Sequence, residues 1–575
     1  MPFVTRNRIS ILFVILLVAI GGWLFYQRFH RVALENYVPE SALGYLEVND
    51  LPQLLDHFVH TEAWQQLAPI YEVKNGLQYA GWASWLGRWT GIGTKETLLF
   101  SRGQFVVVVS GIEVRGDEVK PRIALVMETH GSNASVKALM SERLPKLAER
   151  AYRQPIQENS EYAGTPISIY RAPQGERQIL SAAVGSTWII ANDAEALQSC
   201  IDVRQGRRAS MGENNLLALA KTEVKQSGDI FAFVSQSGAS RLSQFFTHLV
   251  LGKALDGTPL AGLAEGLIGE ITQGTVEAMA YTTSFADGGV QDRYAVLCKP
   301  EAAASIRSAF RVPEKSELEK SPALSFVPPT AQEVTLVNLE DPGLALDGAE
   351  RIVSAHLGAA QSFLFHKFFT SARKTFLGLE PGEDAVGAVG TEVVRYSLPA
   401  LGENKSDRVW VIAARNRQKL SQMATRLLQQ QGAGIGRIAH QGIELTVARD
   451  GKRAFAFLGN YLVLSQTEHV RHLIESHHKQ SGWVKSEPFT TARIPAQTTP
   501  SLMYNFSSIA EETRKMMEIA ARRFKGKPQA DATKVLDRLP WAATVTLLTE
   551  HGIYREANSP VGSFPLAVAF IDTVF

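Results

Sequence analysis

Residues 459–475 read GNYLVLSQTEHVRHLIE, and residues 185–202 read GSTWIIANDAEALQSCID. In each stretch a Gly-containing turn precedes a run of aromatic and β-branched residues, which favours a strand, and then an amphipathic pattern, which favours a helix. From Trp188 and Tyr461 onward the two stretches align without a gap. A match of this length within one chain predicts an internal repeat.

The similarity extends over most of the chain. VPESALGYLEVN at Val38–Asn49 aligns with VPPTAQEVTLVN at Val327–Asn338, and RIALVMET from Arg122 aligns with RVWVIAAR from Arg408. The step between matched segments falls from 289 to 263 residues along the chain, while the order of the segments does not change. Small loop deletions in the second copy would produce this drift.

The sequence therefore predicts a first α+β repeat at 38–300, a helix and linker at 301–325, a second α+β repeat at 326–560, and an apolar tail at 561–575. Strands joined by Gly turns pair antiparallel, and helices between them can cover one face of a sheet. The predicted fold class is α+β: an N-terminal transmembrane helix, then two duplicated domains of mainly antiparallel sheet with helices packed on one face. The tail segment Phe564–Ile571 is expected to add an edge strand.

An apolar stretch, ISILFVILLVAIGGWLFY, occupies Ile9–Tyr26 and contains no charged residue. As a helix it would cover about 27 Å, close to the thickness of the bilayer hydrocarbon. It is longer than the apolar core of a signal peptide, and no Ala-x-Ala site follows it closely, which indicates an uncleaved anchor. The short tail 1–8 is easiest to leave in the cytoplasm, so we expect a single-pass inner (plasma) membrane protein with an extracytoplasmic body.

The charge and cysteine content exclude some functions. Lys and Arg total 59 against 57 Asp and Glu, so no excess of positive charge is available to neutralise a phosphate backbone, and nucleic acid is not an expected partner. Cys200 and Cys298 are the only cysteines, which excludes a disulfide framework and a Cys-based zinc site. They could form one bridge, but two buried thiols are the favoured interpretation.

Several segments resemble a bacterial domain-of-unknown-function family of single-pass extracytoplasmic proteins. These are the entry strand PESALGYLEVND at 39–50, LGLEPGEDAVGAVGTEVV at 377–394, and GNYLVLSQTEHVRHLIE with the downstream SEPF at 486–489. The first copy departs from the pattern, because residues 86–109 lack the acidic turn of Glu380, Glu383 and Asp384. The resemblance implies a fold and a location, and it supplies no activity and no site residues.

Catalytic and metal-binding fragments are present but incomplete. Ser371 and Lys374 form an S-x-x-K pair without the other motifs of penicillin-binding enzymes, so a solvated helix face is the favoured interpretation. His469 and His472 lie three apart on a predicted helix, where imidazoles can bind zinc. Their counterparts in the first copy are Ala196 and Ser199, so a solvated helix face is favoured here too. We therefore predict no catalytic set, no metal ligands and no cofactor.

Trp82, Trp85 and Trp89 form an aromatic stripe at helical spacing. Such a stripe can stack on the sugars of a cell-wall glycan, lie at a membrane interface, or face the core of its own domain. Burial is the commonest of these arrangements, and Phe376 occupies the position of Trp85 in the second copy. The three Trp residues are therefore only weak candidates for a binding site.

These observations lead to one functional hypothesis and one alternative. The hypothesis is a membrane-anchored extracytoplasmic protein that binds or organises components of the bacterial cell envelope. Its partners would be the lipid bilayer, through Ile9–Tyr26, and an envelope protein or glycan. The alternative is a hydrolase directed at cell-wall material, which would need a polar catalytic cluster that the sequence does not reveal.

Overall fold

The computed structural model describes residues 31–67, 103–115, 118–226, 228–255, 259–286, 288–314, 318–380, 383, 386–398, 407–429, 434–476, 482–496, 500–510, 513–514, 535 and 537–563. The chain divides into two compact units. Unit 1 comprises residues 1–56, 79–218 and 229–232, and unit 2 comprises residues 57–78, 219–228 and 233–575. Unit 2 thus contains the second repeat together with the last part of the first.

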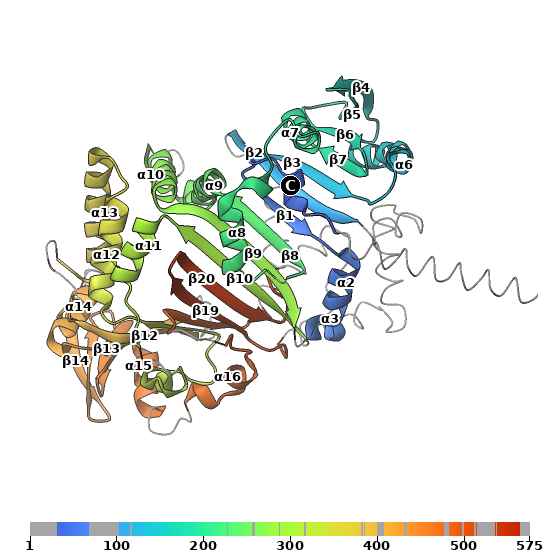
Figure 1. The fold of residues 1–575 in the computed structure, drawn as a ribbon. Helices are drawn as coiled ribbons and strands as arrows, with labels where there is room; N and C mark the ends of the chain where they lie inside the picture. Colours follow the sequence, from blue (N-terminus) through green and yellow to red (C-terminus); the bar gives the residue numbers. More distant parts are fainter. Residues whose placement is uncertain are drawn as a thin grey trace, which may run out of the picture. The chain divides into compact units, whose positions relative to one another are not determined.

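Figure 1 shows the helices and strands of the chain. The strands of the first repeat are β1 (Gly44–Val48), β2 (Gln104–Arg115), β3 (Glu118–Glu128), β4 (Ile156–Tyr162), β5 (Thr165–Arg171), β6 (Gln178–Val184), β7 (Thr187–Ala191), β8 (Ile230–Ser235), β9 (Val276–Ala286) and β10 (Gly289–Cys298). Its helices are η1 (Leu34–Tyr37), α2 (Leu51–Val59), α3 (Glu62–Leu67), α6 (Asn133–Tyr152), α7 (Ala194–Arg204), η3 (Met211–Glu213), α8 (Asn215–Glu223), α9 (Gln236–Leu255) and α10 (Pro259–Thr275).

The second repeat follows α11 (Pro300–Ala309), η4 (Leu318–Lys320) and η5 (Pro322–Phe326). Its strands are β11 (Glu333–Asn338), β12 (Val389–Leu398), β13 (Asp407–Ala414), β14 (Ile435–His440), β15 (Ile443–Ala448), β16 (Arg453–Leu458), β17 (Tyr461–Gln466), β18 (Met503–Ser507), β19 (Ala542–Thr549) and β20 (Gly552–Ser559). Its helices are α12 (Pro342–Ser354), α13 (Ala359–Leu377), α14 (Arg417–Gln429), α15 (Thr467–Ser476), η6 (Trp483–Lys485) and α16 (Glu487–Thr491).

The strands pair in the same order in both repeats. In the first, β4, β5, β6, β7, β3, β2 and β1 are successive antiparallel neighbours. In the second, β14, β15, β16, β17, β13, β12 and β11 form the same series. The hairpin β9–β10 likewise corresponds to the hairpin β19–β20. Both stretches quoted first from the sequence form a strand followed by a helix, as β7–α7 and β17–α15.

Within unit 2 the last strands of the two repeats, β10 and β20, pair antiparallel, and Figure 1 shows them side by side. Arg293 lies opposite Glu556, and these residues are 263 positions apart. Adding 263 to the numbers of Gln291 and Ser284, which pair in the first hairpin, gives Tyr554 and Leu547, which pair in the second. Arg293 therefore faces its own counterpart, which is the arrangement of strands related by a two-fold axis.

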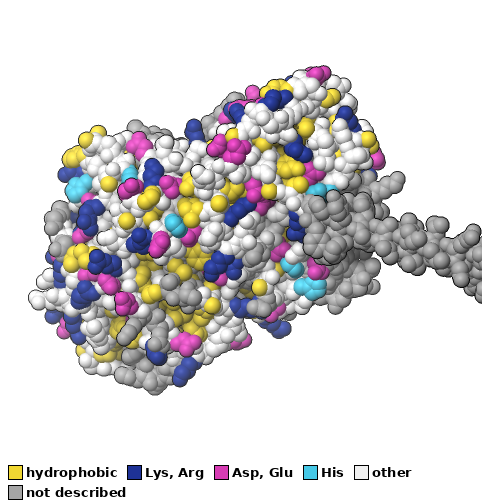
Figure 2. All heavy atoms as spheres, in the orientation of Figure 1, with side chains coloured by type: hydrophobic (Ala, Val, Ile, Leu, Met, Phe, Trp, Pro, Cys, Tyr) yellow, Lys and Arg dark blue, Asp and Glu magenta, His cyan; other side chains and the backbone are white. Residues whose placement is uncertain are grey.

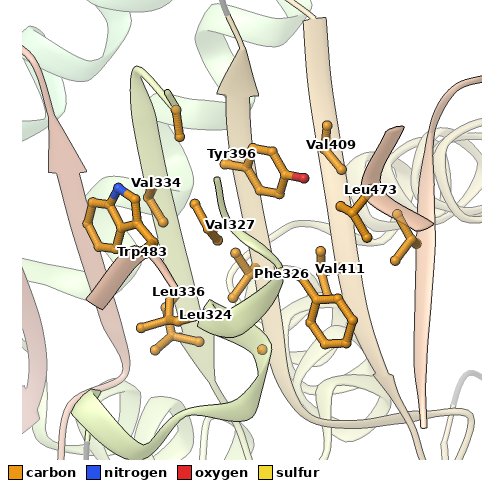
Figure 3. Close-up of a cluster of buried hydrophobic side chains, with 14 of the residues drawn as sticks. Leu324, Phe326, Val327, Val334, Leu336, Tyr396, Val409, Val411, Leu473 and Trp483 are labelled. Atoms are coloured by element: carbon orange, nitrogen blue, oxygen red, sulfur yellow. The ribbon is translucent and has the colours of Figure 1, made fainter. Parts of the chain in front are cut away.

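The main core of unit 2 lies on one face of the second repeat's strands. Figure 3 shows Val334, Tyr396 and Val409 pointing into this cluster together with Trp483 from η6. The Trp483 ring is fully buried and lies 4.9 Å from the ring of Phe506 and 5.2 Å from that of Phe489. Alternate residues of each strand enter this cluster, because successive side chains point to opposite faces of a sheet.

The opposite face of the same strands is also covered. Leu420, Ala424 and Leu428 of α14 pack on Phe455 and Leu462, whereas the neighbouring residues Ala456 and Val463 enter the cluster of Figure 3 on the side of α15. The prediction that helices pack on one face was therefore wrong. Both faces of these strands are apolar, so each needs a covering layer.

The predicted fold class was wrong in one further respect. The strands belong to one sheet of twenty strands and not to a separate sheet in each domain. Among the described residues, no helix combines the length and the apolar character that crossing a membrane requires. The long α13, for example, carries Lys367, Arg373 and Lys374. The proposed span Ile9–Tyr26 and the tail Phe564–Ile571 lie outside the described residues.

The strand register differs from the gapless alignment by one residue. Met127 pairs with Trp188 in the first repeat, and Ile412 pairs with Leu462 in the second. Trp188 and Leu462 both face the helix that follows the third strand of their repeat, so Trp188 corresponds to Leu462 and not to Tyr461. A shift of one residue exchanges the two faces of a strand, so burial reveals it where sequence similarity alone does not.

Candidate binding groove

The residues singled out from the sequence do not converge on a site. Trp82, Trp85 and Trp89 lie outside the described residues. His469 is buried in α15 while His472 is exposed, so the prediction that both occupy a solvated face was wrong for His469. Within the described ranges no three His, Cys, Asp or Glu side chains are placed to hold a metal ion.

The two cysteines are free, buried thiols, as the favoured interpretation predicted. Burial raises the pKa of Cys200 to about 12 and that of Cys298 to about 11. Because the thiolate is the reactive form, neither thiol is suited to nucleophilic chemistry near neutral pH.

Unit 1 contains a buried carboxylate that the sequence analysis did not single out. Glu128, at the end of β3, accepts hydrogen bonds of 3.0 Å from the Tyr37 and Thr187 hydroxyls and one of 2.9 Å from the His130 backbone N–H. Burial alone would raise the pKa of Glu128, but the hydrogen bonds to its carboxylate outweigh burial and lower it. A carboxylate satisfied in this way holds segments of the fold together.

The buried network continues through the amide of Gln104. Its Oε1 accepts the Val32 backbone N–H at 3.0 Å and lies 3.0 Å from Nε2 of His130, and its Nε2 donates to Asn49 Oδ1 at 2.8 Å. The Arg204 guanidinium lies over the Tyr37 ring at 4.4 Å and donates to Thr187 Oγ1. Gln104, Glu128 and Thr187 are all buried, so we interpret this network as structural.

A surface groove in unit 2 is a better candidate for a binding site than the buried network of unit 1. It lies between α14 and the strands β15 and β16 and has a volume of about 620 Å³. Its lining combines polar and aromatic side chains: Arg417, Gln418, Ser421, Gln422, Glu444, Thr446, Phe455 and Phe457, with Gly442 and Ile443. A volume of this size is within the range of small-molecule sites.

The amphipathic pattern of α14 creates one wall of the groove. The helix begins after Asn416, whose side chain accepts the Lys419 backbone N–H at 3.0 Å and so caps the first turn. Leu420, Ala424 and Leu428 form the face that packs on the sheet. Gln418, Ser421 and Gln422 consequently lie along the side of the helix that borders the groove.

The strands supply the rest of the lining. The Arg417 guanidinium lies over the Phe457 ring at 4.5 Å, and the Phe455 and Phe457 rings meet edge to face at 6.3 Å. Glu444, the carboxylate of the lining, is well exposed and lies 3.6 Å from the Arg437 guanidinium. Amides and hydroxyls both donate and accept hydrogen bonds, so this lining suits an uncharged, hydroxyl-rich ligand that has one apolar face.

In the first repeat, α6 occupies the place of α14. There α6 packs Leu144 and Ala148 against Tyr170 of β5, with Met140 and Ile179 beside them. A second cluster joins Val136 to Met127 and Trp188. Pro145 lies inside α6, and the apolar side chains of this helix cover β5 and β6 of the first repeat.

Comparisons with known proteins assign no function to these features. No family model matches the chain, and no curated protein or solved structure matches it either. The resemblance to a domain-of-unknown-function family therefore stays a prediction. The acidic turn around Glu383 has a structural role. The Glu383 carboxylate accepts a hydrogen bond from the Arg426 guanidinium, and the Glu383 backbone carbonyl accepts one from Arg373 at 2.9 Å.

Sequence analysis missed the groove. The spacing of Gln418 and Gln422, four apart on the polar side of α14, was a usable signal for a shared helical face. The facing wall comes from β15 and β16, so only the folded structure shows that these amides border Phe457 and not solvent alone.

Proposed function

We propose that the protein is an extracytoplasmic binding or scaffold protein of the cell envelope, built by internal duplication and held at the membrane by Ile9–Tyr26. The groove beside α14 is its ligand site, and the ligand class is a glycan. The observation that carries this proposal is the lining itself, which combines amide and hydroxyl side chains with the Phe457 ring.

The chemistry of sugars supports this choice of ligand. A pyranose ring presents hydroxyl groups around its edge and C–H groups on its face, so it matches a site with amide hydrogen bonds and an aromatic surface. Gln418 and Gln422 can each donate and accept, and Phe457 offers the apolar contact next to Arg417. The exposed Glu444 carboxylate can accept hydrogen bonds from a hydroxyl edge.

The proposal is tested by calorimetric titration of the full chain in detergent with N-acetylglucosamine tetrasaccharide. We expect saturable binding that weakens at least tenfold, equivalent to about 1.4 kcal/mol, when Gln418→Ala and Gln422→Ala are combined. Phe457→Ala should weaken binding to a similar extent. Gln429→Ala is the matched control, because it removes an amide from an exposed position of α14 that does not line the groove.

The titrated samples also discriminate between binding and hydrolysis. An intact tetrasaccharide after prolonged incubation supports a binding protein, whereas release of shorter products that the groove variants abolish would favour the cell-wall hydrolase. An absence of saturable binding, with unchanged unfolding midpoints in all variants, would refute the groove as a glycan site.

A further inference from the structure

The helix α13 of unit 2 has an unusual surface. It is 19 residues long, and none of its residues is buried. Phe376 is 75% exposed, Phe368 70%, Phe363 60% and Leu364 45%. Figure 2 shows hydrophobic side chains at the upper left, where Figure 1 places this helix. A concentration of large apolar side chains on a surface marks an interaction site more often than chance exposure.

Contacts on one side of α13 hold the helix in place. Arg373 donates to Asp347 of α12 at 2.9 Å, and Lys374 pairs with Glu380 at 3.1 Å. Gly378 ends the helix with φ of +67°, and a Cβ there would lie 2.4 Å from the Met423 carbonyl oxygen of α14. Gln361, in the first turn, donates to Glu270 of α10 at 2.9 Å. The exposed aromatic side is therefore presented by a helix that is fixed at both ends.

The composition of α13 indicates what the surface contacts. The helix contains Lys367, Arg373, Lys374 and His366 and has no acidic residue of its own. Carboxylates of neighbouring segments pair with three of these: Glu350 with His366, Asp347 with Arg373 and Glu380 with Lys374. The Lys367 ammonium lies 5.5 Å from the centre of the Phe363 ring, so a cation and an exposed aromatic ring share one location. Exposed Phe and Leu residues beside basic side chains, without acidic ones, are typical of helices that lie in the interface of a membrane containing anionic lipids.

We propose that α13 is a membrane-surface helix that inserts Phe363, Leu364 and Phe368 among the headgroups of a bilayer, with Lys367 contacting anionic phosphates. Long basic side chains can keep their charge at headgroup level while their stems and neighbouring rings lie deeper. The proposal does not depend on glycan binding at the groove.

The first repeat offers a related feature in its sequence. Trp85-Leu86-Gly87 corresponds to Phe376-Leu377-Gly378, so the Trp stripe aligns with the segment that ends α13. Phe376 is exposed, which shows that an aromatic at this position of the second repeat does not serve the core.

The test places a fluorescent label at Phe368→Cys in the full chain reconstituted in nanodiscs, and uses Ile438→Cys on β14 as the matched control. Cys200 and Cys298 are buried, so the label reaches the introduced thiols. With brominated phosphatidylglycerol we expect at least a twofold loss of fluorescence at position 368 and little change at position 438. With brominated phosphatidylcholine the loss at 368 should be smaller, and Lys367→Glu should reduce it in the anionic bilayer.

Two results would overturn the proposal. Equal quenching at positions 368 and 438 would mean that α13 has no preferred contact with lipid. Energy transfer between labels at 368 on different copies, in nanodiscs or in detergent, would instead identify a second copy of the chain as the occupant of this face. A circular dichroism spectrum and unfolding midpoint like those of the wild type check that each variant is folded.

Discussion

The two repeats have the same strand order and differ in what covers their strands. On β5 and β6 of the first repeat, α6 packs Leu144 and Ala148 against Tyr170, with Met140 and Ile179 beside them. On β15 and β16 of the second, α14 packs with Leu420, Ala424 and Leu428, and the amides beside this apolar stripe border a groove. Both repeats alternate buried and exposed residues along their strands, and this pattern specifies the fold. The polar residues at the edge of α14 decide whether the surface beside it can bind a ligand.

A second difference lies at the end of the third strand. Glu128 of β3 is buried and bonded to Tyr37 and Thr187, while the pairing registers place Ala413 at the matching position of β13. One repeat therefore stabilises this region with a buried carboxylate, and the other places a small apolar side chain there. The strand order is the same with either solution, so the fold does not require the carboxylate.

The largest effect is expected where the repeats meet. Arg293→Glu would place two carboxylates opposite each other on β10 and β20, where Arg293 Nε and Glu556 Oε1 now lie 3.8 Å apart and both side chains are largely buried. Breaking a buried pair costs about 3–5 kcal/mol. Urea unfolding of the full chain in detergent should show a loss of this size.

The reversed pair tests whether the charges themselves matter. Combining Arg293→Glu with Glu556→Arg should recover a substantial part of the lost stability, because opposite charges again face each other. The matched control is Arg437→Glu, which acts on an exposed pair with Glu444 and should change stability by less than about 1 kcal/mol. Equal losses of stability at both pairs, or no recovery in the reversed pair, would contradict the role given to the Arg293–Glu556 pair between β10 and β20.

A smaller effect is expected at the buried carboxylate of the first repeat. Glu128→Gln replaces a charged acceptor of three hydrogen bonds, and leaving such partners poorly satisfied costs about 1–3 kcal/mol at neutral pH. The pKa of Glu128 is lowered in the folded protein, so its contribution is present above the ordinary value of 4.5 and is lost as pH falls below that value.

The pH dependence supplies the check for Glu128. The stability difference between wild type and Glu128→Gln should shrink as unfolding is measured at progressively lower pH below 4.5. Glu176→Gln is the control, because Glu176 pairs with Lys120 at 3.1 Å on the surface. A difference that stays constant with pH would mean that the carboxylate charge does not stabilise unit 1.

The sequence predicted local elements well and their packing less well. The helix expected after residue 300 formed as α11, and the two stretches expected as strand and helix formed as β7–α7 and β17–α15, because Gly turns and periodicity are local signals. The pairing of β10 with β20 was not foreseen, because contacts between distant strands leave little trace in one sequence. The one-residue shift between Trp188 and Tyr461 arose because similarity in apolar runs does not distinguish the two faces of a strand.

The site was harder to predict for a similar reason. Glu128 follows Ala124 and Val126 at the strand period of two, so its position on the buried face could have been recognised. The groove depends on how far α14 stands from Phe457, and the exposure of Phe368 depends on what packs against α13. Both are properties of the tertiary structure, and a helical pattern alone does not distinguish a core face from a membrane-surface face.

Hydrogen–deuterium exchange of the full chain with and without N-acetylglucosamine tetrasaccharide tests most directly the central claim, that the ligand site lies beside α14 of the second repeat and not beside α6 of the first. We predict slower exchange in residues 417–422 and 443–457 and no change in the matching segments of the first repeat, residues 133–140 and 165–182. Protection of the first repeat's segments alone, or equal protection of both, would contradict the assignment of the groove beside α14 as the ligand site.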